Sequence, residues 1–156
     1  MYKHILIPTD GSELSRNAVE HGVALAKAIN AKVTALTVSN PFHTFAVEPG
    51  MVTDTPDQYK KRIADLAAKY LAVAADAAAA LGVTCDVLSV GHDHPYQAII
   101  DTAKKLGCDA IVMASHGRRG VSAIVLGSET VKVLTHSAVP VVVVRGQHPG
   151  AFFVAS

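Results

Sequence analysis

The sequence predicts an α/β domain, in which an open parallel sheet carries helices on both faces. Five short apolar runs alternate with longer segments whose apolar residues recur at helical spacing. Strands that alternate with helices form βαβ units with right-handed crossovers, and such units build a parallel sheet that is covered on both sides. At 156 residues the chain has the size of one domain with a substantial core, and it contains no internal repeat.

Turn residues separate the expected elements. The expected strands cover residues 3–8, 32–38, 83–90, 109–114 and 139–145. The expected helices cover about 14–30, 56–81, 95–106 and 127–137. Asp10 or Ser12 can cap the first helix, and Pro95 suits the first turn of the third. Gly82 and Gly107 are typical residues at helix C-termini.

The expected helices bury stripes of apolar residues that follow the helical period. These are Leu14, Ala18, Leu25 and Ile29 in the first helix, Ile63, Leu66, Ala67, Tyr70, Ala74, Ala77 and Leu81 in the second, and Ile99, Ile100, Ala103 and Leu106 in the third. Residues 40–57 follow neither period, and a loop of this length is often functional, so a lid is one interpretation. The tail 146–156, which holds Phe152-Phe153-Val154, either frays or docks on a partner.

Composition argues against several classes of protein. A net charge of +1 gives no electrostatic attraction to nucleic acid or to an anionic membrane, and the absence of Trp, with four Tyr and four Phe, disfavours base-stacking platforms. No apolar run approaches the ~20 residues that span a bilayer, and the apolar run before Pro8 is too short for a signal peptide, so we expect neither a membrane span nor a signal peptide. Cys85 and Cys108 fit no metal or disulfide framework, so we expect reduced core thiols in a cytoplasmic protein.

The most informative segment runs from Ile111 to Thr130. An apolar strand leads into a loop with Gly117, Arg118, Arg119 and Gly120, and a second turn at Gly127-Ser128 opens a helix. Glycines let backbone N–H groups approach a phosphate, and the first N–H groups of a helix are unpaired and electropositive. The segment is therefore either an anion-binding cradle, with a hydroxyl from Ser128 and charge from an arginine, or a glycine-rich connection made only for tight turning.

This segment resembles the universal stress proteins, whose ATP-binding members carry G-x2-G-x9-G-[ST] here. The chain has Ala114-x2-Gly117-x9-Gly127-Ser128, which matches at all but the first position. The resemblance extends to Ile5-Leu6-Ile7-Pro8-Thr9-Asp10-Gly11-Ser12 and to Val139-Pro140-Val141-Val142-Val143-Val144. It covers residues 1–145 as one nucleotide-binding domain and leaves 146–156 as a tail.

The resemblance implies a Rossmann-like fold with strand order 3-2-1-4-5 and a ligand at the carboxyl ends of the first and fourth strands, where the winding reverses. The ligand it implies is ATP, with Mg²⁺. The residues implied to border adenosine are Pro8, Thr9, Asp10 and Val38, and those implied to border ribose and phosphates are Met113, Ala114, Gly117, Gly127, Ser128, Glu129 and Thr130. Arg118 lies in the same loop and suits an anion. The resemblance also implies a homodimer through the apolar edge strand Val139–Arg145.

Some residues admit other readings. Asp10 is either a turn residue or a hydrogen-bond acceptor for the ligand. Ala114 adds a Cβ that would disfavour a left-handed backbone, which bears on affinity more than on the place of the site.

Ser115-His116 could be a nucleophile pair, but adjacent residues rarely face each other and no G-x-S-x-G elbow is present. His92-Asp93-His94 lacks a second ligand pair at zinc-site spacing, and the Walker A pattern is absent.

Three functions remain open on the sequence alone. The first is a stress-response or signalling protein that binds ATP with slow or no hydrolysis, because no general base can be assigned. The second is an adenylate-using enzyme of the same fold, but such enzymes carry a Ser-Gly-Gly-x-Asp-Ser loop where this chain has Thr9-Asp10-Gly11-Ser12-Glu13-Leu14. The third is an interaction module whose nucleotide site has decayed, for which Ala114 is the sequence hint.

Overall fold

The computed structural model describes residues 1–41, 55–117 and 126–146. The elements, in chain order, are β1 (His4–Pro8), α1 (Glu13–Ile29), β2 (Lys32–Ser39), α2 (Pro56–Leu81), β3 (Cys85–Gly91), α3 (Pro95–Leu106), β4 (Ala110–Ala114), α4 (Ser128–His136) and β5 (Val141–Val144). The expected lid within 40–57, the arginines at 118 and 119 and the tail lie wholly or mostly outside the described residues.

The strands form one parallel sheet in the order β3-β2-β1-β4-β5, which confirms the predicted fold class. β1 is central: His4 lies opposite Lys32 of β2, and Ile5 lies opposite Ala110 of β4. The winding reverses between β1 and β4, because the chain runs from β1 outward to β3 and then returns to the other side of β1. Parallel strands open a crevice at their carboxyl ends at such a reversal.

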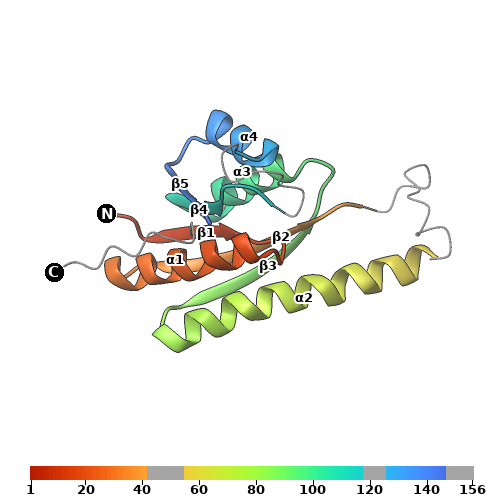
Figure 1. Cartoon of the computed structure of the whole chain (residues 1–156), viewed down its shortest axis with the longest axis horizontal. Helices are drawn as coiled ribbons and strands as arrows, with labels where there is room; N and C mark the ends of the chain where they lie inside the picture. Colours follow the sequence, from red (N-terminus) through yellow and green to blue (C-terminus); the bar gives the residue numbers. More distant parts are fainter. Residues whose placement is uncertain (42–54, 118–125, 147–156) are drawn as a thin grey trace.

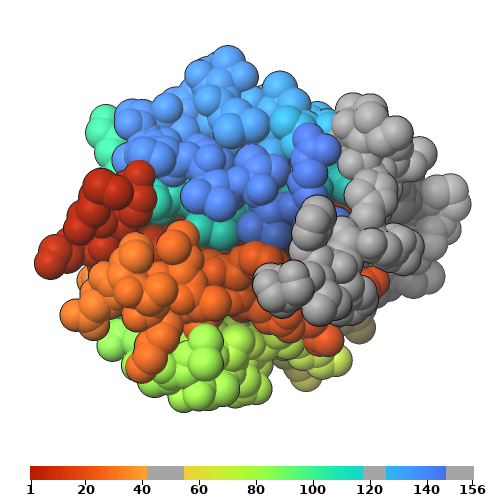
Figure 2. All heavy atoms as spheres, turned by 60° about the vertical axis from the view of Figure 1, so that its left-hand side comes forward, coloured from red at the N-terminus to blue at the C-terminus, as the bar shows by residue number. Residues whose placement is uncertain are grey.

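Two layers of helices cover the sheet. Figure 1 shows α1 and α2 together on one face and α3 and α4 on the other. In Figure 2, the surface of α1 (orange) lies between α2 (green) and the C-terminal part of the described chain (blue). Alternate residues of β1 serve the two layers, since Ile5 and Ile7 pack with α1 and α2 while Leu6 packs against Ile99 of α3 and Val133 of α4.

Local signals set the helix ends, and the caps at Ser12, Gly82 and Gly107 are as predicted, whereas the one at Thr55 was not predicted. Ser12 caps α1 and accepts a hydrogen bond from the Ser15 N–H at 3.2 Å. α2 begins with a capping box in which Thr55 and Gln58 satisfy each other's backbone N–H groups. Gly82 and Gly107 end α2 and α3 in the left-handed conformation, where glycine has no Cβ penalty.

The helix faces and some strand ends differ from the prediction. Leu81 and Leu106 are 42% and 39% exposed, because each is the last residue of its helix and has neighbours on one side only. Leu71 and Ala78, which were not predicted, are buried on α2 instead. Three strands are displaced or shorter than predicted: β3 begins and ends later than 83–90, β4 begins at 110, and β5 covers only 141–144.

Both cysteines are free thiols in or near the core, as predicted. Cys108 is buried under α3, and burial raises the pKa of its thiol to about 11. Cys85 is half-buried on the edge strand, and burial also raises its pKa. Neither thiol is therefore poised to react at neutral pH. Within the described ranges, no helix is both long and apolar enough to cross a membrane.

Candidate functional site

Two adjoining hollows open at the carboxyl ends of β1, β2 and β4, where α3 and α4 begin. The inner hollow has a volume of about 200 Å³ and mostly apolar walls, whereas the outer one, of about 450 Å³, is more polar. Asp10, Gly117, Glu129 and Thr130 line both, so the two are parts of one cleft. This is the crevice that the winding of the sheet creates between β1 and β4.

The structure brings together nearly all of the predicted site residues. Those that line the inner hollow are Pro8, Thr9, Asp10, Val38, Met113, Ala114, Gly117, Glu129 and Thr130. Gly127 and Ser128 line the outer hollow, and Arg118 lies outside the described residues. The lining residues that the sequence did not predict are Ser15, Leu36, Pro95, Ile99 and His116 in the inner hollow and Asn40 and Asp93 in the outer one.

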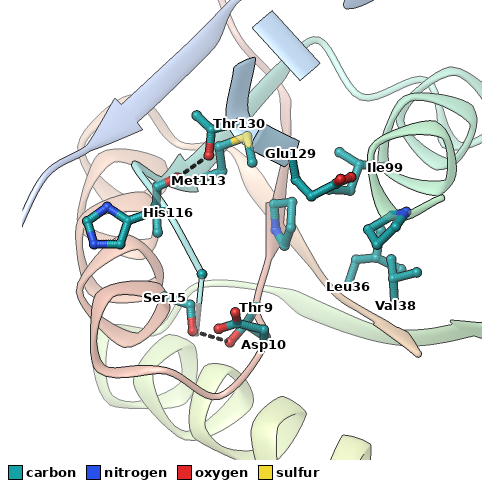
Figure 3. A pocket seen from close by; sticks show the side chains of 14 residues that line it. Thr9, Asp10, Ser15, Leu36, Val38, Ile99, Met113, His116, Glu129 and Thr130 are labelled. Carbon is teal, nitrogen blue, oxygen red and sulfur yellow. Dashed lines mark hydrogen bonds between the residues drawn. The ribbon is translucent and has the colours of Figure 1, made fainter. Parts of the chain in front are cut away.

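The inner hollow has an apolar wall. Leu36 is fully buried, and Ile99 and Met113 are nearly so. Figure 3 shows Leu36, Val38 and Ile99 gathered on one side of the hollow, with Thr9 and Asp10 on another. Such a slot between apolar side chains suits a flat ring that carries polar atoms on its edge.

Hydrogen bonds fix the loop after β1. The Thr9 N–H donates to the Leu36 carbonyl at 2.8 Å, and the Thr37 hydroxyl donates to the Thr9 carbonyl at 3.0 Å. Asp10 has the turn role that was one of its two predicted readings, because its Oδ1 accepts from the Ser12 N–H at 3.0 Å. The Asp10 side chain also lines the cleft, so the turn holds a carboxylate at the cleft wall.

Gly11 and Tyr70 hold this loop against α2. Gly11 has φ +76°, which favours glycine, and a Cβ at this position would overlap the Tyr70 ring. Any side chain at Gly11 would displace Tyr70. Helix α2 therefore packs behind the loop that forms the floor of the cleft.

The β4–α4 connection presents a helix N-terminus to the cleft. The Thr130 hydroxyl donates to the Ala114 carbonyl at 3.0 Å, which ties the first turn of α4 to the end of β4. Gly127 is the N-cap and offers no side chain to the first N–H groups of the helix. Uncapped N–H groups and the helix dipole favour negative charge, so the outer hollow combines an electropositive helix end with the carboxylates of Asp10, Asp93 and Glu129.

The two motif glycines have different physical roles. A Cβ on Gly117 would collide with the Asp10 carboxylate inside the cleft. A Cβ on Gly127 would lie 2.8 Å from the Cβ and 2.9 Å from the Cα of His116. Close packing against His116 therefore requires a residue without a side chain at position 127. The Gly127 N–H donates to the Ser115 carbonyl at 2.8 Å and is not available to a phosphate, which corrects the sequence interpretation of this glycine.

Ala114 is an ordinary strand residue. It pairs with Val144, is 8% exposed, and packs in the core cluster on the α1 side. Asn30 is the non-glycine residue with positive φ in the described ranges, so Ala114 is not left-handed. The concern that its Cβ would strain the backbone is therefore wrong, because the position needs no glycine conformation.

Ser115 and His116 contact each other, contrary to our expectation for adjacent side chains. Ser115 Oγ and His116 Nδ1 are 3.1 Å apart. Ser115 is nevertheless only 5% exposed, and its backbone N–H donates to Val144 while its carbonyl accepts from Gly127. A serine held this way is a structural residue of the β4–α4 connection, and it lines neither hollow.

The histidines before α3 form a turn. His92 Nδ1 accepts a hydrogen bond from the His94 N–H at 2.9 Å, which is a local turn contact. In the part of the chain that the structure describes, no three His, Cys, Asp or Glu side chains lie close enough to hold a metal ion.

Comparison with known proteins identifies the family. The universal stress protein family matches residues 1–145. Universal stress protein MJ0531 of Methanocaldococcus jannaschii is 29% identical over 153 residues, spanning 93% of this chain and 83% of its own. A universal stress protein of Thermus aquaticus is 30% identical over 145 residues, spanning 93% of this chain and all of its own.

Solved structures agree with the sequence comparison. The structure of MJ0577, a universal stress protein of Methanocaldococcus jannaschii, superposes with a TM-score of 0.75 at 29% identity, over 95% of this chain and 99% of that one. A universal stress protein in complex with cAMP superposes with a TM-score of 0.66 at 26% identity, over 92% of this chain and 97% of that one. From the family match, these relatives and the shared fold, we conclude that the chain belongs to the universal stress protein family.

Proposed function

We propose that this protein binds an adenine nucleotide, ATP with Mg²⁺, and acts as a stress-response or signalling switch. The observation that carries the proposal is the two-part cleft, in which an apolar slot adjoins a polar hollow at a helix N-terminus. The adenine ring fills the slot beside Leu36, Val38 and Ile99. Ribose and phosphates extend over Gly117 to Ser128 and Thr130 at the start of α4. The cAMP complex of a relative supports the choice of an adenine base.

The charge of the cleft supports a divalent cation as part of the ligand. Asp10, Asp93 and Glu129 line the outer hollow, and no Lys or Arg does so among the described residues. A bare triphosphate next to these carboxylates would be repelled, whereas Mg²⁺ neutralises phosphate charge and accepts oxygen ligands. Because the described residues form no protein-only metal cluster, the phosphates would hold most of the ion, with Asp10 or Asp93 offering an oxygen.

The proposal includes a homodimer through β5. This strand is at the edge of the sheet, and Val142 on it is 43% exposed, as are Val131 and Leu134 of the adjoining α4 at 45% and 41%. An apolar edge strand is a template for pairing with another chain. Two copies of β5 related by a two-fold axis would cover these side chains.

The proposal can be tested on the purified protein. The protein is denatured, and any released small molecule is identified by mass spectrometry. Backbone NMR signals are then followed while ATP and Mg²⁺ are added to the ligand-free protein. We expect a released adenine nucleotide, and shifts at residues 8–11 and 127–130. Saturating ATP that leaves these signals unchanged would support an interaction module with a decayed site instead.

A further inference from the structure

Glu129 of α4 completes the first turn of α3. Helix α3 has His94 as its N-cap, and His94 makes no side-chain cap. Pro95 has no N–H, and the N–H groups of Gln97 and Ala98 both donate to the His94 carbonyl, at 3.1 and 3.2 Å. The N–H of Tyr96 is therefore the remaining donor of this turn. It donates to Glu129 Oε2 at 2.9 Å.

The ring of Tyr96 makes a second contact with α4. Lys132 Nζ lies 5.3 Å from the centre of this ring, and the ring of His136 lies 5.6 Å from it. Lys132 also approaches Glu129 Oε1 at 3.3 Å, so the lysine joins both parts of the link. Tyr96 is thus held through its backbone by Glu129 and through its ring by Lys132 and His136.

This link lies at one wall of the cleft. Pro95 and Ile99, which flank Tyr96 on α3, line the inner hollow, and Thr130, which follows Glu129, lines both hollows. Thr130 is itself anchored to β4 through the Ala114 carbonyl. The chain of contacts from β4 through Thr130 and Glu129 to α3 therefore sets the distance between Ile99 and the phosphate-facing end of α4.

We propose that Glu129 is a positioning and charge-selecting residue of the cleft, and that it acts by capping α3 and not by binding the ligand. The inference rests on the proposed nucleotide binding. The group that makes the cap is a carboxylate, and it lies between the N-termini of α3 and α4. The dipoles of the two helices would stabilise a phosphate most strongly in this same region. The residue that builds the wall thereby disfavours ligands whose phosphate charge is not neutralised by a cation.

Two substitutions separate the cap from the charge. Glu129→Gln keeps an oxygen for the Tyr96 N–H and removes the charge, whereas Glu129→Ala removes both. Glu20→Gln is the matched control, because Glu20 is an exposed residue of α1 that does not line the cleft. The probes are adenosine and AMP without metal, titrated by calorimetry. Hydrogen exchange of the Tyr96 amide, measured without nucleotide, reports the cap directly.

Each variant has a distinct expected result. In Glu129→Ala the Tyr96 amide exchanges about fivefold faster or more, and adenosine binding weakens by a similar factor. In Glu129→Gln the Tyr96 exchange rate and the adenosine affinity stay within about twofold of wild type. AMP binds about two- to fivefold tighter, which is the usual effect of one charge at a helix N-terminus. Glu20→Gln changes none of these quantities.

The outcomes against the inference are equally specific. Unchanged Tyr96 exchange in Glu129→Ala overturns the positioning role, and this readout does not depend on nucleotide binding. Unchanged AMP affinity in Glu129→Gln overturns the charge selection. A wild-type protein that binds neither probe, nor ATP with Mg²⁺, contradicts the proposed function, and the exchange data then decide whether Glu129 still links the two helices.

Discussion

Gly117 and Ala114 belong to one motif but meet different physical demands. Gly117 faces the Asp10 carboxylate in the cleft, whereas the Cβ of Ala114 packs in the core of the sheet. The departure from the family pattern at Ala114 therefore falls where an L-residue fits, and the backbone carbonyl of Ala114 still anchors Thr130. The hint of a decayed site therefore cannot rest on backbone strain at Ala114.

The first prediction compares these two positions. Gly117→Val should weaken ATP binding by at least tenfold, since the side chain displaces Asp10 and crowds the phosphate path, a loss of about 1.5–3 kcal/mol. Ala114→Gly should leave ATP affinity within a few-fold and lower the free energy of unfolding by about 0.5–1 kcal/mol. ATP titration and thermal melts measure both effects.

A third glycine provides the control. Gly91→Val changes a strand-end residue whose added Cβ would meet nothing within 4 Å and which does not line the cleft. It should bind ATP like wild type. If Gly117→Val is folded and also binds like wild type, Gly117 does not face the ligand and the phosphate path is elsewhere.

A second prediction concerns His4, a buried residue of β1. Its Nε2 lies 2.8 Å from the Thr34 hydroxyl, and burial, followed by the nearby charge of Lys32, lowers the pKa of His4 below 6.5. The unfolded chain then binds this proton more tightly than the folded protein. The contribution of His4 to stability is therefore present above pH 6.5 and is lost as the pH falls from 6.5 through the lowered pKa.

Urea unfolding at pH 7.5 and pH 5.5 measures this effect. Wild type should lose stability between the two values, and His4→Gln should lose less, because glutamine does not titrate. Asp109 does not contribute to this difference in stability, because its lowered pKa lies below both pH values. Burial alone would raise its pKa, but the N–H groups of Lys3 and His4 outweigh burial and lower it. Equal losses in wild type and His4→Gln would assign the pH dependence to other groups.

At the scale of elements, the hydrogen bonds of β5 show which residues face the open edge. The carbonyl of Pro140 accepts from the Ile111 N–H of β4, and the carbonyl of Val144 accepts from the N–H of Ser115, which follows β4. Successive residues of a strand point their backbone N–H and C=O groups in opposite directions. The backbone groups of Val142 therefore also point toward β4, while those of Val141 and Val143 point toward the open edge of the sheet. A proline at Val142 would therefore remove a hydrogen bond of the sheet itself.

The third prediction follows from this geometry. Val143→Pro removes an outward N–H and should convert a β5-paired dimer into a folded monomer. Val142→Pro should lower the thermal unfolding midpoint as well, because it removes a bond to β4. Light scattering with thermal melts distinguishes the two variants. A wild-type protein that is monomeric at micromolar concentration contradicts the dimer.

Helix ends and strand runs were predictable because their signals are local. Ser12, Gly82 and Gly107 act within one turn of the residues that they cap. The contacts of Leu71 and Glu129 could not be predicted in this way. Leu71 is buried by the placement of α2 on the sheet, and Glu129 meets Tyr96 across 33 residues of sequence.

At the scale of the whole molecule, the periodic pattern predicts a parallel sheet but not its strand order. The order came from the family resemblance, and the structure confirms it. Most of the cleft follows from that order, since it brings the end of β1 next to the end of β4. Ser15, Leu36 and Ile99 were missed as lining residues, because each carries only the signal of a core or helix position in the sequence.

A fourth prediction concerns turnover. Three candidate general bases that line the cleft have hydrogen-bond partners in the protein: Asp10 accepts from the Ser12 N–H, Glu129 accepts from the Tyr96 N–H, and His116 contacts the Ser115 hydroxyl. ATP hydrolysis should therefore be well below about one per second, the low end of ordinary enzyme turnover. Phosphate release by the purified protein measures it. A faster rate that Asp10→Asn abolishes would favour an enzyme.

The central claim is that one cleft holds the base and that α4 holds the phosphates. Calorimetric titration of the ligand-free protein with ATP and Mg²⁺, and separately with adenosine, tests it most directly. We predict that ATP with Mg²⁺ binds at least tenfold more tightly than adenosine, because charge-assisted hydrogen bonds to phosphate contribute about 1.5–3 kcal/mol each. Equal affinities for the two ligands would contradict the claim, since the α4 N-terminus would then contribute nothing to binding.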